Sequence, residues 1–156
     1  TLHNTLFPYT TLFRSVHAEA MPEEFPGTGS ERVLFVDDDP DLTQMAGMML
    51  HQLGYTVETF TNSLAALEAF SNDPDQFDLA IVDQIMPHLM GVELAKRMLQ
   101  TRPGFPVFLL TGYSEGITPE QARDLGIREF VMKPFSSREL GSLIRKTLDA
   151  LAARRN

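Results

Sequence analysis

The sequence has no cysteine, no surplus of basic residues and no long apolar run. Without cysteine there is no disulfide and no thiolate metal site, which fits a reducing compartment, and we expect a cytoplasmic protein. Lysine and arginine number 13 against 21 aspartate and glutamate residues, for a net charge of −8. Such a chain lacks the basic surface that neutralises phosphates, so we expect no nucleic-acid partner. No apolar run approaches the ~20 residues that span a bilayer, so we also expect no membrane segment in this chain.

The first residues do not resemble part of a folded domain. Residues 5–15, TLFPYTTLFRS, resemble the in-frame translation of a common sequencing adapter, and we predict that residues 1–15 are an assembly artefact with natural sequence lost upstream. A secretory signal is the alternative, but the stretch has no basic start, and Pro8 interrupts its apolar residues. Residues 16–31 carry Pro, Gly, Glu and Ser without apolar periodicity, which predicts a flexible linker. We therefore expect one folded domain over residues 32–152.

Short apolar runs alternate with helical patterns along this domain. Most of these runs are continuous, as in strands that are buried on both faces of a parallel sheet. They are RVLFV (32–36), DLAIV (78–82), VFLL (107–110) and EFVM (129–132). A further run, TVETF (56–60), alternates apolar and polar residues, which predicts a strand nearer the edge of the sheet.

Apolar residues at helical spacing predict helices between and after these strands, each with its apolar face toward the core. A weaker helical pattern covers residues 116–125. Repeated strand–helix units with short connections predict an α/β fold, an open doubly wound parallel sheet with helices on both faces. The predicted core stripes are Leu42, Met45, Met49 and Leu53; Leu64, Leu67 and Phe70; Leu94, Ala95, Met98 and Leu99; and Leu140, Leu143, Ile144, Thr147, Leu148 and Leu151.

Polar residues follow the predicted strands at the edge where such a sheet binds its ligand, the carboxyl ends of the strands. There is neither a G-x-G-x-x-G after the first strand nor a P-loop, which argues against a dinucleotide or nucleotide site. Carboxylates gathered at one edge repel by ~4 kcal/mol per pair at ~4 Å and an effective dielectric near 20. The residues that the strands deliver there are Asp37 and Asp38, then Asp83, Thr111 and Lys133.

This set of side chains predicts chemistry on a phosphoryl group. Magnesium, which takes oxygen ligands, would offset the repulsion between the carboxylates and orient an incoming phosphoryl group. One carboxylate would then act as the nucleophile and form an aspartyl phosphate. Lys133 would neutralise one phosphate oxygen, and the Thr111 hydroxyl would donate a hydrogen bond to another.

The motifs VLFVDDDP, DLAIVDQIMPHLMG, VFLLTGYSE and FVMKPFS resemble the receiver domains of bacterial two-component response regulators. The resemblance covers about residues 32–152 and implies a flavodoxin-like, five-stranded parallel sheet of strand order 2-1-3-4-5. It implies that Asp83 accepts a phosphoryl group from the phosphohistidine of a histidine kinase or of a histidine phosphotransfer domain. It also implies that Mg²⁺ is held by Asp37, Asp38, Asp83 and the main-chain carbonyl of Ile85.

The resemblance assigns further roles near the fifth strand. Thr111 becomes the switch hydroxyl and Lys133 the essential lysine, and the peptide bond before Pro134 is expected to be cis. The switch aromatic falls on Phe130, which can rotate inward but has no hydroxyl; a plain core role for Phe130 is the alternative. Phosphorylation would change partner binding or dimerisation through the face of the fourth helix and fifth strand. The domain is then a phosphoacceptor in signalling, and its own catalysis is limited to phosphotransfer and autodephosphorylation.

The third aspartate of the VDDDP run has a different expected role. Asp39 precedes Pro40, which suits the first position of a helix, so Asp39 predicts an N-cap with Asp41 favouring the helix dipole. His88 is expected in a solvated loop near the site and His51 on a helix surface. Neither histidine lies in the helical context of a phosphodonor, so we expect the donor to be another protein or domain.

Two other functional readings compete with a phosphoacceptor. A haloacid-dehalogenase-type phosphatase would use Asp37 and Asp39 as its D-x-D pair, with the same threonine and lysine following in order. That family needs an acidic pair after the lysine, where this chain has only Glu139 and Asp149 on the final helix pattern. It would also leave VDQIMP without a role. A degenerate receiver that serves only as a docking module is the other reading, and the complete set of site residues argues against it.

The sequence also suggests where the domain comes from. The stretch PGTGSERVLFVDD and the run LLTGYSEGITPEQARDLGIREFVMKPFSSREL resemble the C-terminal receiver of a hybrid sensor histidine kinase. The given chain ends soon after Lys133, which leaves no room within it for a C-terminal output domain. We therefore expect a fragment of a hybrid kinase, with a stand-alone receiver as the alternative.

Overall fold

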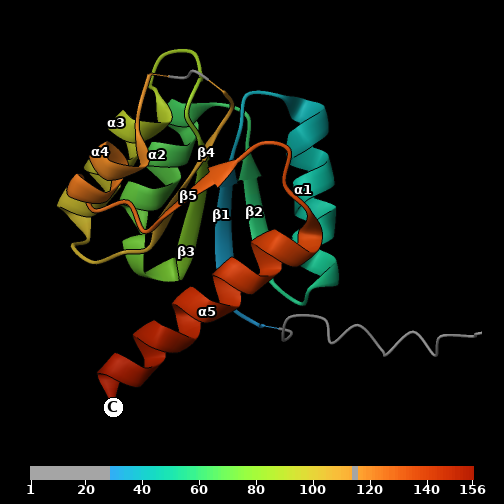
Figure 1. Ribbon diagram of the computed structural model, residues 1–156, viewed down its shortest axis with the longest axis vertical. Helices are drawn as coiled ribbons and strands as arrows, with labels where there is room; N and C mark the ends of the chain where they lie inside the picture. The colour runs from blue at the N-terminus through green and yellow to red at the C-terminus, as the bar shows by residue number, and fades with distance from the viewer. Residues whose placement is uncertain (1–28, 114–115) are drawn as a thin grey trace, which may run out of the picture.

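The computed structural model describes residues 29–113 and 116–156 (Figure 1). The predicted artefact at residues 1–15 lies outside the described residues, as does the predicted linker up to residue 28.

Five parallel strands form one sheet in the order β2-β1-β3-β4-β5. The predicted fold class and strand order are therefore confirmed, and the alternating run lies in the edge strand β2, as expected. The strands are β1 (Arg32–Val36), β2 (Thr56–Phe60), β3 (Leu79–Asp83), β4 (Val107–Thr111) and β5 (Glu129–Met132).

Helices cover both faces of the sheet (Figure 1). One apolar core lies beneath α2, α3 and α4, and a second lies beneath α1 and α5. Within the described residues, no helix has both the length and the apolar character to cross a membrane. The helices are α1 (Pro40–Gln52), α2 (Ser63–Asn72), the 3₁₀ helix η2 (Pro74–Gln76), α3 (Gly91–Thr101), α4 (Pro119–Asp124) and α5 (Ser137–Arg155).

The prediction of the buried face was only partly right for α1, since Leu53 is buried and Met49 packs against the core. Its buried residues are Thr43, Ala46 and Leu50, one position away from the predicted stripe. Met45, predicted in the core, is 50% exposed. Small side chains on the sheet-facing side allow a helix to pack close to the strands, and a long side chain such as that of Met45 then lies at the edge of the interface.

In α2 the prediction is also only partly right, since Phe70 is buried and Leu67 packs against the core, whereas the other long helices follow the sequence pattern. Ser63 and Ala66 are buried in α2, and Leu64 is 47% exposed. The predicted stripes are confirmed for α3 and α5, whose buried residues include Leu94, Ala95 and Met98, and Leu140, Ile144, Thr147 and Leu148.

The prediction that the β5 run is buried on both faces was also wrong. Val131 is buried, whereas Glu129 and Phe130 are partly exposed and Met132 is exposed. β5, like β2, is an edge strand of the sheet, so its sides receive less cover than those of β3, which is buried along its whole length.

The register of the sheet brings distant residues together at one edge. Val36 pairs with Val82, so the residues that follow them, Asp37 and Asp83, lie side by side. Thr111 at the end of β4 pairs with Met132, which precedes Lys133. All the strands are parallel, so these strand ends share the carboxyl edge of the sheet.

Candidate functional site

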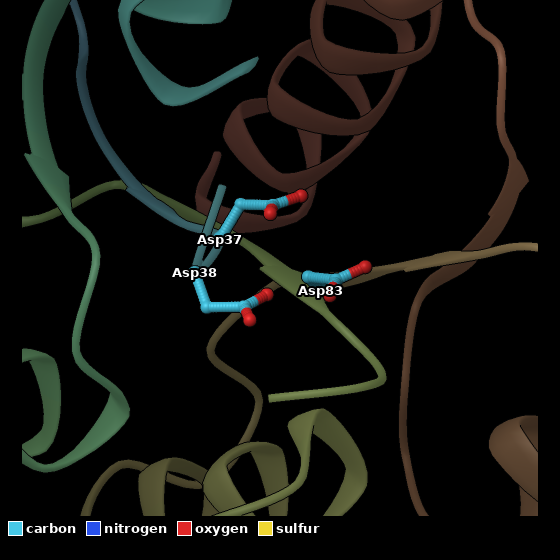
Figure 2. Close-up of side chains that lie close together, drawn as sticks. All are labelled: Asp37, Asp38 and Asp83. Atoms are coloured by element: carbon cyan, nitrogen blue, oxygen red, sulfur yellow. The ribbon is translucent and has the colours of Figure 1, made fainter. Parts of the chain in front are cut away.

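Three carboxylates converge at the carboxyl ends of β1 and β3 (Figure 2). Asp37 follows β1 and Asp83 ends β3, and their residues are only 1% and 3% exposed. Asp38, the next residue after Asp37, is exposed. One oxygen of each carboxylate lies within 4.8 Å of an oxygen of the other two.

Lys133 supplies the positive charge at this cluster. Its Nζ lies 2.7 Å from Oδ2 of Asp37 and 2.7 Å from Oδ1 of Asp83. Burial lowers the pKa of Lys133, but the hydrogen bonds and charges of the two aspartates outweigh it and hold that pKa above its ordinary value. The lysine is therefore a fixed cation between two buried carboxylates. The peptide bond between Lys133 and Pro134 is cis, the geometry that the sequence resemblance implies.

Thr111 lies next to the lysine on the neighbouring strand. The main-chain N–H of Lys133 donates to the carbonyl oxygen of Thr111 at 2.8 Å. Thr111 is buried, and its hydroxyl donates to the carbonyl oxygen of Gly112 at 3.0 Å. Phe130 on β5 is partly buried and packs against the core beneath α3 and α4. The structure thus places both predicted switch residues on adjacent strands, with the threonine hydroxyl engaged by the main chain.

The first and third aspartates of the run, Asp37 and Asp39, have different hydrogen-bond partners. Asp37 has both oxygens engaged, because Oδ1 accepts from the N–H of Asp39 at 2.9 Å and Oδ2 pairs with Lys133. Asp39 accepts from the N–H groups of Asp41 and Leu42 at 2.9 and 3.2 Å. The prediction that Asp39 is the N-cap of α1 is confirmed. A D-x-D pair of Asp37 and Asp39 is not assembled, because the Asp39 carboxylate faces the first turn of the helix.

Sequence reasoning missed two residues that hold the loops around the carboxylates. The Thr43 hydroxyl lies 2.8 Å from the carbonyl oxygen of Asp37 and 2.7 Å from that of Asp39, so its one O–H can donate to either. Gln84 is 3% exposed and hydrogen bonds to the start of α3. Both are buried polar residues close in sequence to an aspartate of the site, Thr43 near Asp37 and Gln84 next to Asp83. The predicted histidine positions agree with the structure, since His51 and His88 are exposed.

The donor set fits a hard divalent cation. Carboxylate oxygens are the ligands that Mg²⁺ prefers, and it is usually bound through few protein groups with several waters retained. Two buried acids and one exposed acid within 4.8 Å of one another offer such a set with access to solvent. The adjacent ammonium adds a second positive charge, so the site can accept an anionic phosphoryl group.

The comparison with protein families decides what kind of domain this is. The model of the response regulator receiver domain matches residues 33–145. The chain belongs to the response regulator receiver family. The match takes in the five strands, except the first residue of β1, and every residue of the carboxylate–lysine cluster.

Curated relatives of this receiver domain include transcriptional regulators. The CpxR homolog of Haemophilus influenzae is 34% identical over 80% of this chain and 53% of that protein. The transcriptional regulatory protein CreB of Escherichia coli is 32% identical over 76% of this chain and 51% of that protein. The chain thus spans about half the length of these two relatives. The response regulator receiver protein CpdR of Brucella abortus is 32% identical, with 98% of its length covered.

Solved structures share the fold of this receiver domain. A CheY-like receiver domain protein from Methanospirillum hungatei has a TM-score of 0.73 and 29% identity, over 81% of this chain and 99% of that chain. A receiver domain protein from Clostridium thermocellum has a TM-score of 0.76 at 24% identity. The domain is therefore a signalling receiver, and the comparisons give no support to the phosphatase alternative.

Proposed function

We propose that Asp83 accepts a phosphoryl group from the phosphohistidine of a histidine kinase or of a histidine phosphotransfer domain. The observation that carries this proposal is the position of Asp83, buried at the end of β3 and paired with Lys133 beside two further carboxylates. A carboxylate oxygen of Asp83 attacks phosphorus, a P–O bond forms, and the P–N bond to the histidine breaks. The imidazole nitrogen keeps the electron pair of the broken bond, so no further reactant is needed.

The proposed metal is Mg²⁺, held by Asp37, Asp38, Asp83 and the main-chain carbonyl of Ile85. When bound, it offsets the charge on the carboxylates and on the transferred phosphoryl oxygens. Asp38 is the exposed acid of the set, whereas Asp37 keeps both oxygens engaged by Lys133 and a main-chain N–H. Asp38 is therefore the carboxylate best placed to bind the ion without first breaking a contact.

Lys133 and Thr111 would respond to the new phosphoryl group. The ammonium that neutralises Asp83 before transfer lies close enough to pair with a phosphate oxygen after it. The Thr111 hydroxyl would leave the carbonyl of Gly112 and donate to the phosphate. The main-chain hydrogen bond from the N–H of Lys133 to the carbonyl of Thr111 would couple the movement of Thr111 to β5 and so to Phe130. The expected result is a change in partner binding, or dimerisation, at the face formed by α4 and β5.

A surface beside the site suits the incoming kinase. A cavity of about 310 Å³ is lined by Leu42 and Met45 of α1 and by the segment Lys133, Pro134 and Phe135. This surface is mostly apolar and ends at the lysine of the site, so a partner helix packed there would carry its histidine close to Asp83. We propose this as the docking surface for the phosphodonor.

A further proposal concerns the longer protein from which this domain comes. From the stretches PGTGSERVLFVDD and LLTGYSEGITPEQARDLGIREFVMKPFSSREL, we propose a cytoplasmic receiver from the C-terminal end of a hybrid histidine kinase. The net charge of −8 favours protein partners over nucleic acid for this domain. Genomic sequence upstream of the adapter-like segment tests the origin. A kinase domain in frame would support it, and a start codon near Met21 with no kinase before it would refute it.

Mass spectrometry tests the phosphoacceptor. The protein is incubated with Mg²⁺ and a small acyl phosphate, and its intact mass is measured. We expect a gain of one phosphoryl group in the wild type and no gain in Asp83→Ala. A folded wild type without the mass gain would contradict the proposal. Asp83→Asn separates the receiver from a phosphatase, since turnover of a phosphate ester that persists in this variant would favour the phosphatase.

A further inference from the structure

Gln84, the residue after the proposed phosphoacceptor, joins the end of β3 to the start of α3. Its main-chain N–H donates to the carbonyl oxygen of Leu110 at 2.8 Å, and its own carbonyl accepts from the N–H of Gly91 at 3.0 Å. Its side-chain Oε1 accepts from the N–H of Val92 at 3.0 Å. Both main-chain groups and the side chain of this buried residue are therefore used to fix the base of the loop 85–90.

The side chain of Gln84 takes the place of a helix cap. The first N–H groups of a helix have no partner within the helix and need an acceptor from elsewhere. Met90 is the N-cap residue of α3, and within the described structure its side chain makes no capping hydrogen bond. Gln84 supplies the acceptor from the end of a strand instead, which ties the orientation of α3 to the main chain beside Asp83.

A close approach at Gly91 completes this connection. A Cβ added to Gly91 would overlap the carbonyl group of Asp83 and the Cα of Gln84. The first residue of α3 thus rests directly on the main chain of the phosphoacceptor. Farther along the loop, the Ser63 hydroxyl donates to the carbonyl oxygen of Pro87 at 3.0 Å. The loop is held at its base and at its middle, and Ile85 lies between these two points.

From these contacts we infer that Gln84 is a positioning residue for the metal site, because it fixes the loop whose Ile85 carbonyl is the proposed Mg²⁺ ligand. The inference rests on the proposed function. Groups that hydrogen bond behind a metal ligand fix its direction, and their loss weakens metal binding even though they never touch the ion. Gln84 would act in this way through the main chain.

Calorimetric titration of the full chain with Mg²⁺ tests the role of Gln84. Gln84→Met keeps the length of the side chain and removes the acceptor, and we expect its Kd for Mg²⁺ to rise by about tenfold. Gln84→Glu keeps an acceptor for the N–H of Val92 and adds a negative charge, so its Kd should stay at the wild-type value or fall. The matched control is Thr118→Ala, which removes the N-cap of α4 and should leave the Kd unchanged. Thermal unfolding in EDTA shows whether each variant is folded.

The outcomes separate the inference from the proposed function. A wild-type Kd in Gln84→Met would overturn the positioning role, as would an equal loss of affinity in Thr118→Ala. If Asp38→Asn binds Mg²⁺ as well as the wild type does, the proposed metal site itself is wrong. Loss of binding in Asp38→Asn with a normal Kd in Gln84→Met would leave the metal site standing and remove only the role of Gln84.

Discussion

Replacing Lys133 by methionine tests the electrostatics of the site most directly. The substitution keeps the length of the side chain and removes the charge that lies 2.7 Å from Asp37 and 2.7 Å from Asp83. Two buried carboxylates would then face each other without a cation. We expect Lys133→Met to lower the free energy of unfolding at neutral pH in the absence of Mg²⁺.

The size of the loss follows from the geometry of the carboxylates. Their oxygens are no more than 4.8 Å apart, and two charges at that separation repel by about 3.5 kcal/mol at an effective dielectric near 20. Removing one partner of a buried ion pair costs ~3–5 kcal/mol, and the 26% exposure of the Lys133 side chain favours the lower end of that range. We therefore expect a loss of about 3 kcal/mol, most of which Mg²⁺ should restore.

Urea unfolding followed by circular dichroism measures this loss, with Lys96→Met as the matched control. Lys96 forms an exposed pair with Glu93 at 3.6 Å, so its substitution should cost under ~1 kcal/mol. In the wild type, the pKa of Lys133 lies above its ordinary value of 10.5. Its contribution to the free energy of unfolding is therefore complete below pH 10.5 and is lost only as pH rises past the raised pKa of the folded state. Equal losses in Lys133→Met and Lys96→Met would refute the reasoning.

Three further predictions concern the surroundings of the site and the opposite edge of the sheet. Asp38→Ala removes an exposed member of the acidic cluster, so in EDTA it should raise the free energy of unfolding by ~1 kcal/mol. The same variant should no longer be stabilised by added Mg²⁺. A lower free energy of unfolding in EDTA would contradict this prediction. Gly91→Ala should lower the free energy of unfolding, measured in urea, by ~3 kcal/mol, because a Cβ there would overlap the last carbonyl group of β3. The control is Gly47→Ala in α1, which should be nearly neutral because its Cβ would meet only one methyl group, at 3.2 Å. Arg145 holds the pKa of Glu31 below its ordinary value of 4.5. We therefore expect the wild type to be more stable than Arg145→Met by ~1 kcal/mol above pH 4.5. This difference in the free energy of unfolding should disappear as pH falls through the lowered pKa of Glu31. An advantage that persists at pH ~2 would show that packing, and not the ion pair, is responsible.

The strands and the candidate site follow from the sequence because buried parallel strands have a simple pattern, whereas the strand order came from the resemblance to receiver domains. A continuous apolar run that ends in a polar residue marks both a central strand and the side chain that it delivers to the carboxyl edge. Asp83 after LAIV and Thr111 after VFLL are found in this way, and the structure brings them to one edge with Lys133. The edge position of β2 was equally visible, because one side of that strand carries polar residues.

The buried faces of α1 and α2 could be predicted only in part. Helical periodicity finds the large apolar residues, but these helices pack against the sheet through small ones such as Ala46 and Ala66. The first half of the predicted stripe of α1 then lies at the surface, where Leu42 and Met45 line the cavity beside Lys133. Gln84 was missed for a related reason, since its role depends on a helix that lacks its own cap, and this is a tertiary property.

The VDDDP run shows how three identical neighbours acquire different roles from the geometry of one turn. The chain leaves β1 at Asp37, whose side chain still points into the sheet edge and meets Lys133. Asp39 must face α1, because its carboxylate caps the first turn. Asp38, between them, is left exposed with its carboxylate near the buried acids. A metal ion can therefore approach from solvent through Asp38 without disturbing the lysine pair or the helix cap. Moving the triplet by one residue would place the helix cap on a proposed metal ligand, so the proposed cation site depends on the register of β1 and not only on the number of aspartates.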